Sequence, residues 1–370
     1  QGIPREDGFN ISVASEVMAV LTLAKDVEDL KVRLKRMVIG YTQSRTPITV
    51  GDLKAEGAVA MILKDAIKPN LVQTLEGTPA LVHGGPFANI AHGCNSIIAT
   101  KLALKLSDYV VTEAGFGADL GAEKFLNIKT QEGELTPNAV VIVATIRALK
   151  MHGGMRKDDL KNEDVQALEK GFENLEKHIE TIQTFGLPYV VAINEFPTDT
   201  QKEVERLSRL LEEKNHPYAL SKVFANGGEG GVELAHKVLE ALEKPSHFKP
   251  LYTPTDSLEL KIKTIAQTVY GARDVVFSES AKRQLRTFKK AGWSDLRICM
   301  AKTQSSLSDD PKKMGRPRDF TLTIRELRPS IGAGFIVALT GNMMTMPGLP
   351  KIPSAVHMKL NEDGRVDGLF

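Results

Sequence analysis

The sequence is poor in several features that mark particular protein classes. It has two cysteines among 370 residues, Cys94 and Cys299, and neither belongs to a CxxC pair. Two distant cysteines exclude a disulfide-rich framework and a cysteine-based zinc or redox motif, so a reducing compartment, the cytoplasm, is expected. No apolar run reaches the roughly 18 residues that a membrane span needs. Residues 1–7 lack the apolar core of a signal peptide.

Net charge and common nucleotide motifs are lacking as well. The formal net charge is only +2, which argues against a nucleic-acid or membrane-surface partner. The patterns GxxxxGK[ST] and GxGxxG are absent from the whole sequence. The chain therefore carries neither the phosphate-binding loop of P-loop enzymes nor the dinucleotide fingerprint, and the second absence argues against a nicotinamide-dependent oxidoreductase.

What the sequence does contain is an alternation of apolar strands and helical segments. This pattern is typical of a parallel sheet covered on both faces. We expect an α/β fold with a doubly wound, mostly parallel sheet and a second α/β domain. The predicted strands are Ala80–Gly84, Tyr109–Thr112, Ala139–Ala144, Tyr189–Ile193, Ile298–Ala301, Thr321–Ile324 and Phe335–Leu339.

Capping residues place several helix ends. A long amphipathic helix is predicted from Asn162 to Phe185, ended by Gly186. Thr198–Thr200 offers a cap for a second helix over Glu203–Glu213. We predict three regions: 1–55, the remnant of a truncated N-terminal or insert domain; 56–174, a core α/β domain; and 175–370, a C-terminal α/β domain.

Two glycine-rich segments follow predicted strands and are candidate ligand loops. The first, His83–Gly93, contains Gly84 and Gly85 together with Asn89 and His92. Glycines and a helix N-terminus suit an anion, and both polar side chains could donate to phosphate or carboxylate oxygens. A plain connector, with both side chains capping the helix, explains the same pattern equally well.

The second segment, Thr112–Phe125, combines glycines with charged side chains. Its spacing, Gly115-x-Gly117-x-x-x-Gly121, differs from that of a dinucleotide loop. Carboxylates suit a metal, a monovalent cation or an amine better than a pyrophosphate. The alternative is a solvated surface turn. The charged residues are Glu113, Asp119, Glu123 and Lys124.

Two further features admit competing interpretations. Arg147 and Lys150 could share a helix face and neutralise an anion, but cations before the glycine stop of a helix explain them as well. Phe196 and Phe224 each follow a predicted strand end and could sandwich a flat heterocycle. Two core phenylalanines are the alternative.

Several long words of the sequence resemble formate–tetrahydrofolate ligases. The resemblance extends from Gly2 to Phe370. The words are VATIRALKMHGG (Val143–Gly154), TPALVHGGPFANIAHGCNSIIATK (Thr78–Lys101), VTEAGFGADLGAEKF (Val111–Phe125), KDAIKPNLVQTLEGTPA (Lys64–Ala80), FPTDT (Phe196–Thr200), GGEGG (Gly227–Gly231), MAKTQ (Met300–Gln304) and MTMPGLP (Met344–Pro350).

The resemblance implies ATP-dependent ligation of formate to tetrahydrofolate through formyl phosphate, which N10 of the folate attacks. It implies Mg²⁺ with ATP, a possible monovalent cation, a homotetramer, a cytoplasmic location and no dedicated metal ligands. The first two loops would line the formyl phosphate cleft, and the aromatic pair would hold the pterin. The implied catalytic residues are Asn89, His92, Glu113, Asp119 and Lys124, and the implied binding residues are Gly84, Gly85, Gly115, Phe116, Gly117, Gly121, Asn194, Phe196 and Phe224.

The sequence departs from the family's pattern in three ways. Phe224 stands where many members have a tryptophan, so a stacking face remains without the indole donor. Thr130–Gln131 follow Asn127–Lys129, where the family has Cys-Arg. The family's Walker loop, expected upstream of this segment, is missing, which predicts that this chain corresponds to the C-terminal two-thirds of the family and is inactive by itself. A non-catalytic folate- or nucleotide-binding fragment is the alternative.

Overall fold

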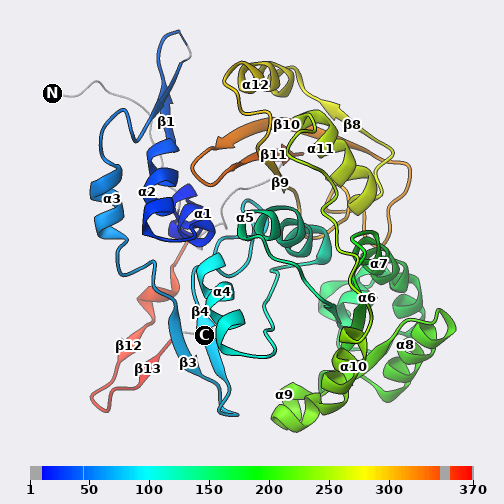
Figure 1. The fold of residues 1–370 in the computed structure, drawn as a ribbon. Helices are drawn as coiled ribbons and strands as arrows, with labels where there is room; N and C mark the ends of the chain where they lie inside the picture. The colour runs from blue at the N-terminus through cyan, green and yellow to red at the C-terminus, as the bar shows by residue number, and fades with distance from the viewer. Residues whose placement is uncertain (1–10, 45, 342–350, 369–370) are drawn as a thin grey trace.

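The computed structural model describes residues 11–44, 46–341 and 351–368. Figure 1 shows helices and strands alternating along the chain, with the green helical part and the yellow-orange sheet on either side of the central helices. The predicted α/β class is confirmed. The MTMPGLP word at Met344–Pro350 lies outside the described residues.

A three-stranded parallel sheet forms one half of the molecule. Its strands are β5 (Val140–Ala144), β6 (Tyr189–Asn194) and β7 (Tyr218–Ser221), in that order. Side chains alternate between the faces of a strand, so Ile142 and Ile193 enter a core with the helices α7 (Val165–Thr184) and α8 (Gln201–Glu213). On the other face α10 (Val232–Leu242) covers β6 and β7, whereas Val143 of β5 is 64% exposed.

The two helices predicted in this half are present, with starts that differ from the predicted ones by three and two residues. The helix α7 (Val165–Thr184) starts after Asp164, whose side chain accepts from the Ala167 N–H at 2.8 Å. It ends at Gly186, whose φ of +74° is readily adopted only by glycine. Thr200 and Glu203 form a capping box at the start of α8 (Gln201–Glu213). The predicted domain boundary at 174 falls inside α7, and the division into domains stays a prediction.

A mixed four-stranded sheet forms the other half. Its order is β8 (Asp274–Phe277), β10 (Thr321–Ser330), β11 (Phe335–Thr340) and β9 (Arg297–Ala301). The central pair is antiparallel and both outer pairs are parallel. The helices α11 (Leu258–Ile265) and α12 (Glu279–Lys290) pack on one face of this sheet and form a hydrophobic core with it.

The first helices of the chain pack on the second face of this mixed sheet. Leu30 and Leu34 share a buried cluster with Phe335 and Leu339. The clustered helices are α1 (Glu16–Leu23) and α2 (Val27–Arg36). The N-terminal segment is therefore part of a core that also contains the C-terminal strands.

Two strand predictions differ from the structure. The strand predicted at Ala80–Gly84 is β4 (Pro79–Val82), and it pairs antiparallel with β3 (Asn70–Gln73) in a hairpin instead of joining a parallel sheet. Tyr109–Thr112 is not a strand. Val111 is 91% exposed, so this apolar run is not buried in a sheet as the pattern suggested.

The remaining elements are smaller and lie around these two halves. Their bounds are β1 (Val38–Tyr41), β2 (Pro47–Thr49), α3 (Glu56–Ile62), α4 (Ile97–Leu106), α5 (Thr130–Gly133), α6 (Ile146–His152), α9 (Val223–Asn226), α10 (Val232–Leu242), β12 (Lys359–Leu360) and β13 (Val366–Asp367). The 3₁₀ and π turns are η1 (Ser12–Ala14), η2 (Ala118–Ala122), η3 (Phe125–Lys129), η4 (Lys157–Asp159), η5 (Gly227–Gly231), η6 (Ala266–Tyr270) and η7 (Ser354–Val356).

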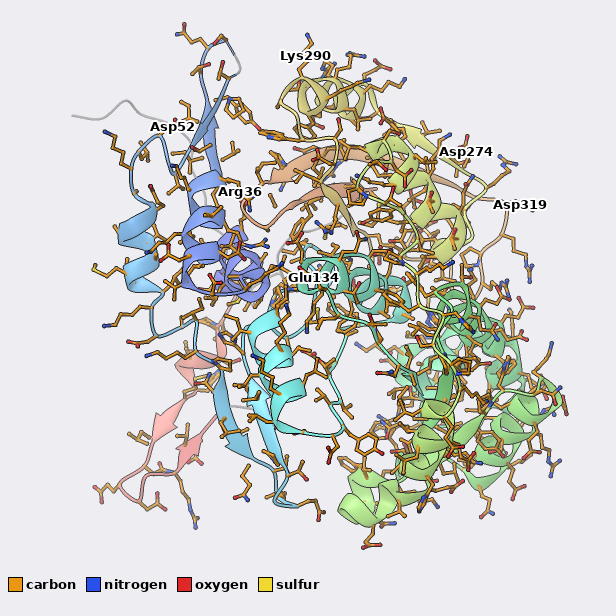
Figure 2. All side chains as sticks on the ribbon, viewed as in Figure 1. Arg36, Asp52, Glu134, Asp274, Lys290 and Asp319 are labelled. Atoms are coloured by element: carbon orange, nitrogen blue, oxygen red, sulfur yellow. The ribbon has the colours of Figure 1, made fainter. Side chains whose placement is uncertain are left out.

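Charged side chains of both signs lie on elements throughout the molecule. Figure 2 labels Arg36 and Asp52 near the N-terminal helices and Asp274, Lys290 and Asp319 around the mixed sheet.

Within the described ranges, no helix combines the length and the apolar character that a membrane crossing requires.

Candidate functional site

The two predicted glycine-rich loops lie against each other. The Gly115 N–H donates to the Gly93 carbonyl oxygen at 2.8 Å. Gly93 has a φ of +61°, and a Cβ there would lie 2.2 Å from the Ala88 Cβ. A Cβ on Gly121 would lie 1.9 Å from the Gly115 carbonyl oxygen. Glycine is required at these positions because the loop backbones are in direct contact.

His92 is turned into the protein and away from solvent. Its side chain is fully buried, and Nε2 lies 3.1 Å from the Thr22 hydroxyl oxygen. That hydroxyl donates to the Met18 carbonyl oxygen at 2.9 Å, so Nε2–H is the donor toward Thr22. Burial, followed by the nearby Lys129, lowers the His92 pKa to about 3. His92 is therefore a neutral residue that joins the first loop to α1.

Asn89 differs from His92 because it lies partly exposed in the first loop. Its Oδ1 atom is buried and has no hydrogen-bond partner among the described residues, and the same holds for His92 Nδ1. Gly84 and Gly85 are exposed at the start of this loop. Gly84 has a φ of +74°, and a Cβ there would lie 2.0 Å from the Thr22 Cγ2.

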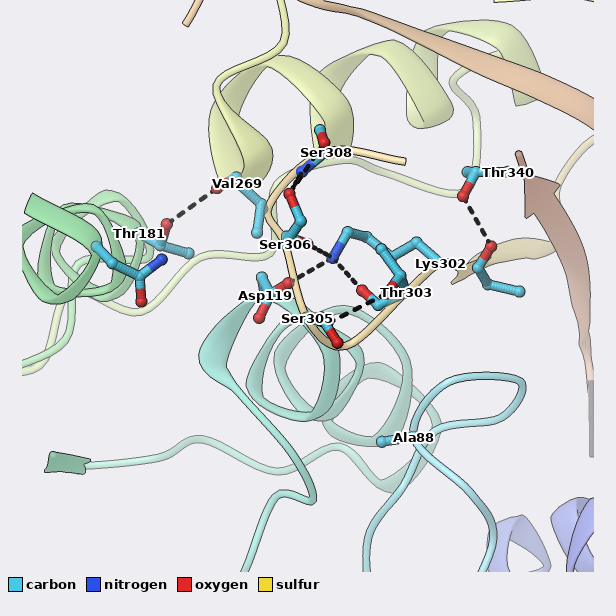
Figure 3. A network of polar contacts seen from close by, with 12 residues as sticks. Ala88, Asp119, Thr181, Val269, Lys302, Thr303, Ser305, Ser306, Ser308 and Thr340 are labelled. Carbon is cyan, nitrogen blue, oxygen red and sulfur yellow. Dashed lines mark hydrogen bonds and ion pairs between the residues drawn. The ribbon is translucent and has the colours of Figure 1, made fainter. Parts of the chain in front are cut away.

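Asp119 forms a buried ion pair with a lysine from the distant MAKTQ word. Lys302 Nζ lies 2.7 Å from Asp119 Oδ2, although the two residues are 183 apart in sequence. Figure 3 shows Lys302 pointing to Asp119 and to the carbonyl groups of Thr303 and Ser306. The ammonium thus has three acceptors. Asp119 joins the second loop to the mixed sheet.

Charge and burial act in opposite directions on the carboxylates of the second loop. Burial opposes ionisation of Asp119, but Lys302 and then His178 hold its pKa below the usual value. Burial raises the pKa of Glu123 to about 7, with Lys124 only partly opposing it. Glu123 Oε1 accepts from Asn127 Nδ2 at 2.7 Å, and its Oε2 has no partner in the described part of the chain.

Lys124 and Glu113 occupy opposite environments. Lys124 is fully buried, and its ammonium donates to the Ala88 carbonyl oxygen. Glu113 is exposed and accepts weakly from the Thr112 hydroxyl at 3.3 Å. Of the five predicted catalytic residues, His92, Asp119 and Lys124 are thus buried and bound within the protein. Glu113 and Asn89 are the two that reach solvent.

Phe116 is held at the tip of the second loop in a strained conformation. Its φ is +61°, and its side chain is 59% exposed. Left-handed backbone is unfavourable for a bulky residue and occurs often at functional sites. Gly115 and Gly117 flank it, and two π-helical turns, η2 and η3, follow. Such π turns are likewise frequent at functional sites.

Phe196 and Phe224 form the second group of predicted site residues. Their ring centroids lie 5.9 Å apart with the planes tilted by 44°. Phe196 follows the carboxyl end of β6, where the partly exposed Asn194 is the last residue. Phe224 lies on α9 directly after β7 and is 70% exposed. Ligand sites of open α/β sheets gather at such strand ends.

Arg147 belongs to this aromatic group, which sequence reasoning did not anticipate. Its guanidinium carbon lies 5.1 Å from the Phe196 ring centroid, and NH2 donates to Thr198 Oγ1 at 2.7 Å. Lys150 instead forms a fully buried ion pair with Glu203, in which Nζ lies 2.8 Å from Oε1. The two cations therefore do not act as a pair. Arg147 lies three residues after Ala144, the last residue of β5. This position close to the carboxyl end of a strand was the signal that the sequence offered for a role beside the aromatic rings.

The described residues offer no evident site for a divalent metal. Among them, no group of three or more His, Cys, Asp or Glu side chains is arranged to hold a metal ion. Mg²⁺ is normally held by carboxylates together with substrate phosphates.

The sequence of the chain matches a known protein family over its whole length. The sequence model of the family described as formate–tetrahydrofolate ligase matches residues 1–370. Enzymes of this family join formate to tetrahydrofolate, with ATP as a further substrate. The match covers the two glycine-rich loops, the aromatic pair and Lys302 alike. This chain belongs to the formate–tetrahydrofolate ligase family.

Proposed function

We propose that this chain supplies the folate-binding side and part of the formyl phosphate cleft of a formate–tetrahydrofolate ligase. In the proposed reaction a formate oxygen attacks the γ-phosphorus of ATP and ADP leaves. N10 of tetrahydrofolate then attacks the formyl carbon, phosphate leaves, and N10 loses its proton. The products are 10-formyltetrahydrofolate, ADP and phosphate.

The observation that carries the folate assignment is the aromatic pair at the ends of β6 and β7. The Arg147 guanidinium carbon lies 5.1 Å from the Phe196 ring centroid, and the Phe196 N–H donates to Asp199 Oδ2 at 2.9 Å. A flat ring between two aromatic rings needs about 7 Å, twice the van der Waals spacing of about 3.5 Å. The rings lie 5.9 Å apart and are tilted by 44°, so we expect the exposed Phe224 ring to turn about its side-chain bonds when the pterin binds, while the backbone of α9 keeps its position.

The proposed roles in the formyl phosphate cleft follow from exposure. We assign contact with a substrate to Asn89 and Glu113, because they are the predicted catalytic side chains that reach solvent. His92, Asp119 and Lys124 would act by holding the loops in position. The backbones of Gly84, Gly85, Gly115 and Gly117, with the ring of Phe116, would line the cleft. Gly121 is buried and would act by letting the second loop fold against Gly115.

We expect the isolated 370-residue chain to form no 10-formyltetrahydrofolate from ATP, formate and tetrahydrofolate. Phosphoryl transfer depends on positioning and on neutralising phosphate charge, and the sequence contains no GxxxxGK[ST] loop to do so. The measurement is formation of the product, with Mg²⁺ and a monovalent cation present. Sustained ATP-dependent turnover by the purified chain would contradict this prediction.

We expect Phe196→Ala to weaken tetrahydrofolate binding about tenfold or more. Stacking contributes about 0.5–1.5 kcal/mol beyond the buried area, and about 1.4 kcal/mol corresponds to a factor of ten. Isothermal titration with tetrahydrofolate measures the change. Tyr109→Ala removes another exposed aromatic ring and is the matched control. Equal affinities for wild type and Phe196→Ala would refute the assignment of this pair.

A non-catalytic folate- or nucleotide-binding protein is the second candidate, and the missing phosphate loop favours it. A turnover assay with an added segment or chain that bears this loop separates the two, because a ligase subunit should gain ATP-dependent turnover and a binding protein should not. The homotetramer, the cytoplasmic location and the need for Mg²⁺ or a monovalent cation stay predictions from the family resemblance.

A further inference from the structure

The tip of the β3–β4 hairpin touches the loop that follows Phe224. Glu76 Oε1 accepts a hydrogen bond from the Gly228 N–H at 2.8 Å, and the two residues are 152 apart in sequence. In Figure 1 the hairpin and α9 extend to the same end of the molecule. The hairpin is otherwise supported on its second strand, where Asn95 Nδ2 donates to the Leu81 carbonyl oxygen at 2.8 Å, whereas all four β3 residues are exposed. The tip is therefore a specific point of contact.

The hairpin turn itself is well ordered by its own hydrogen bonds. The Gly77 N–H donates to the Thr74 carbonyl oxygen at 2.9 Å, and the Thr74 N–H donates to the Thr78 carbonyl oxygen at 2.9 Å. Gly77 adopts a φ of +80°, as glycine does at the end of a three-residue hairpin turn. Glu76 is thus presented by a rigid turn, so its carboxylate can fix the position of a softer segment.

The glycines of the contacted loop make room for this carboxylate. A Cβ on Gly228 would lie 3.0 Å from the Glu76 Cδ and 3.1 Å from Oε1. Gly227 has φ +59° and ψ −147°, a backbone region that is essentially restricted to glycine. The GGEGG word therefore serves two purposes here: it turns the chain after α9 and lets Glu76 approach the backbone.

The position of Phe224 depends on the same short segment. Phe224 lies on the four-residue α9, which ends at Gly227. The other end of the segment is tied by the Lys222 N–H, which donates to the Gly230 carbonyl oxygen at 2.9 Å. The contact with Glu76 is a third tie, just after α9. Loss of this tie would widen the range of positions open to the exposed Phe224 ring.

We propose that Glu76 is a positioning residue for pterin recognition, which holds the Gly227–Gly231 loop and thereby fixes the position of Phe224 relative to Phe196. This inference rests on the proposed folate function. Its physical basis is preorganisation: a binding wall that is already in place loses less conformational freedom when the ligand arrives.

The test compares Glu76→Ala with Glu76→Gln and with Leu75→Ala in the 370-residue chain. Glutamine keeps a carbonyl acceptor for the Gly228 N–H. Leu75, the neighbouring residue of the turn, is fully exposed and controls for a general effect on the hairpin. Tetrahydrofolate affinity is measured by titration. Hydrogen exchange of peptides covering 223–231 is measured by mass spectrometry without ligand.

We expect Glu76→Ala to raise the Kd for tetrahydrofolate about threefold to tenfold, which is the range for one lost hydrogen bond. It should also speed exchange in 223–231 with an unchanged Tm, while Glu76→Gln and Leu75→Ala remain close to wild type. Unchanged exchange and affinity in Glu76→Ala, or tighter binding, would overturn the proposal. If wild type binds no tetrahydrofolate, the proposed function fails and the pterin role of Glu76 fails with it, whereas faster exchange would still establish the contact.

Discussion

Replacing Lys302 with methionine is expected to cost about 3–5 kcal/mol of the free energy of unfolding, the range for breaking a buried ion pair from one side. Lys302 is fully buried, and its ammonium binds Asp119 and two carbonyl groups. Methionine keeps much of the side-chain volume, so the loss arises mainly from leaving the Asp119 carboxylate without its cation. Urea unfolding monitored by circular dichroism measures the effect.

Two companion variants isolate the charge effect of Lys302. The double variant Lys302→Met with Asp119→Asn should recover part of the lost stability, because no uncompensated charge stays buried. Lys282→Met breaks a comparable ion pair, 2.8 Å from Glu279, whose lysine is 49% exposed. Exposed pairs contribute about 0–1 kcal/mol. If Lys302→Met is no more harmful than Lys282→Met, the buried pair does not hold the second loop to the sheet.

Replacing Glu123 with glutamine is expected to stabilise the protein at pH 8 and to have little effect near pH 4.5. Burial raises the Glu123 pKa to about 7 from the usual glutamate value of about 4.5, so the folded state binds a proton more tightly than the unfolded state between these two pH values. Stability therefore falls as the pH rises from about 4.5 to about 7. The full difference corresponds to roughly 3 kcal/mol.

The pH dependence must be read as a difference between variants, because other buried groups titrate as well. Glu16, whose pKa burial also raises to about 7, adds a loss of stability in the same direction. Burial lowers the His92 pKa to about 3. His92 therefore lowers the free energy of unfolding as the pH falls below the usual pKa of histidine. Subtracting the wild-type profile from that of Glu123→Gln removes both. Glu259→Gln, at an exposed position, is the control. A difference that does not change with pH would contradict the burial of an ionisable Glu123.

The arrangement of the loops changes how the predicted catalytic residues should be tested. The family resemblance implies catalytic roles for Asp119, His92 and Lys124. Their partners are instead Lys302, Thr22 and the Ala88 carbonyl group. Substitution of these residues should therefore lower stability, whereas substitution of Asn89 or Glu113 is the more direct test of contact with a substrate.

The sequence by itself determined those strands and helices whose signals lie within or directly beside the element. Strands β5 and β6 are continuous apolar runs, and the ends of α7 and α8 follow from Asp164, Gly186 and the Thr200–Glu203 capping box. These features depend on residues within a few positions of one another. The family also follows from sequence, because long words in the right order are specific.

Only the tertiary structure decided which distant residues meet. The run at Tyr109–Thr112 has the composition of a strand but is not one. Strand β4 pairs with the hairpin partner that precedes it, and not with a parallel neighbour. The contacts of Lys302 with Asp119 and of Glu76 with Gly228 join residues 183 and 152 positions apart. Periodicity and capping signals extend over a few residues only, so pairings of this range depend on how the whole chain packs.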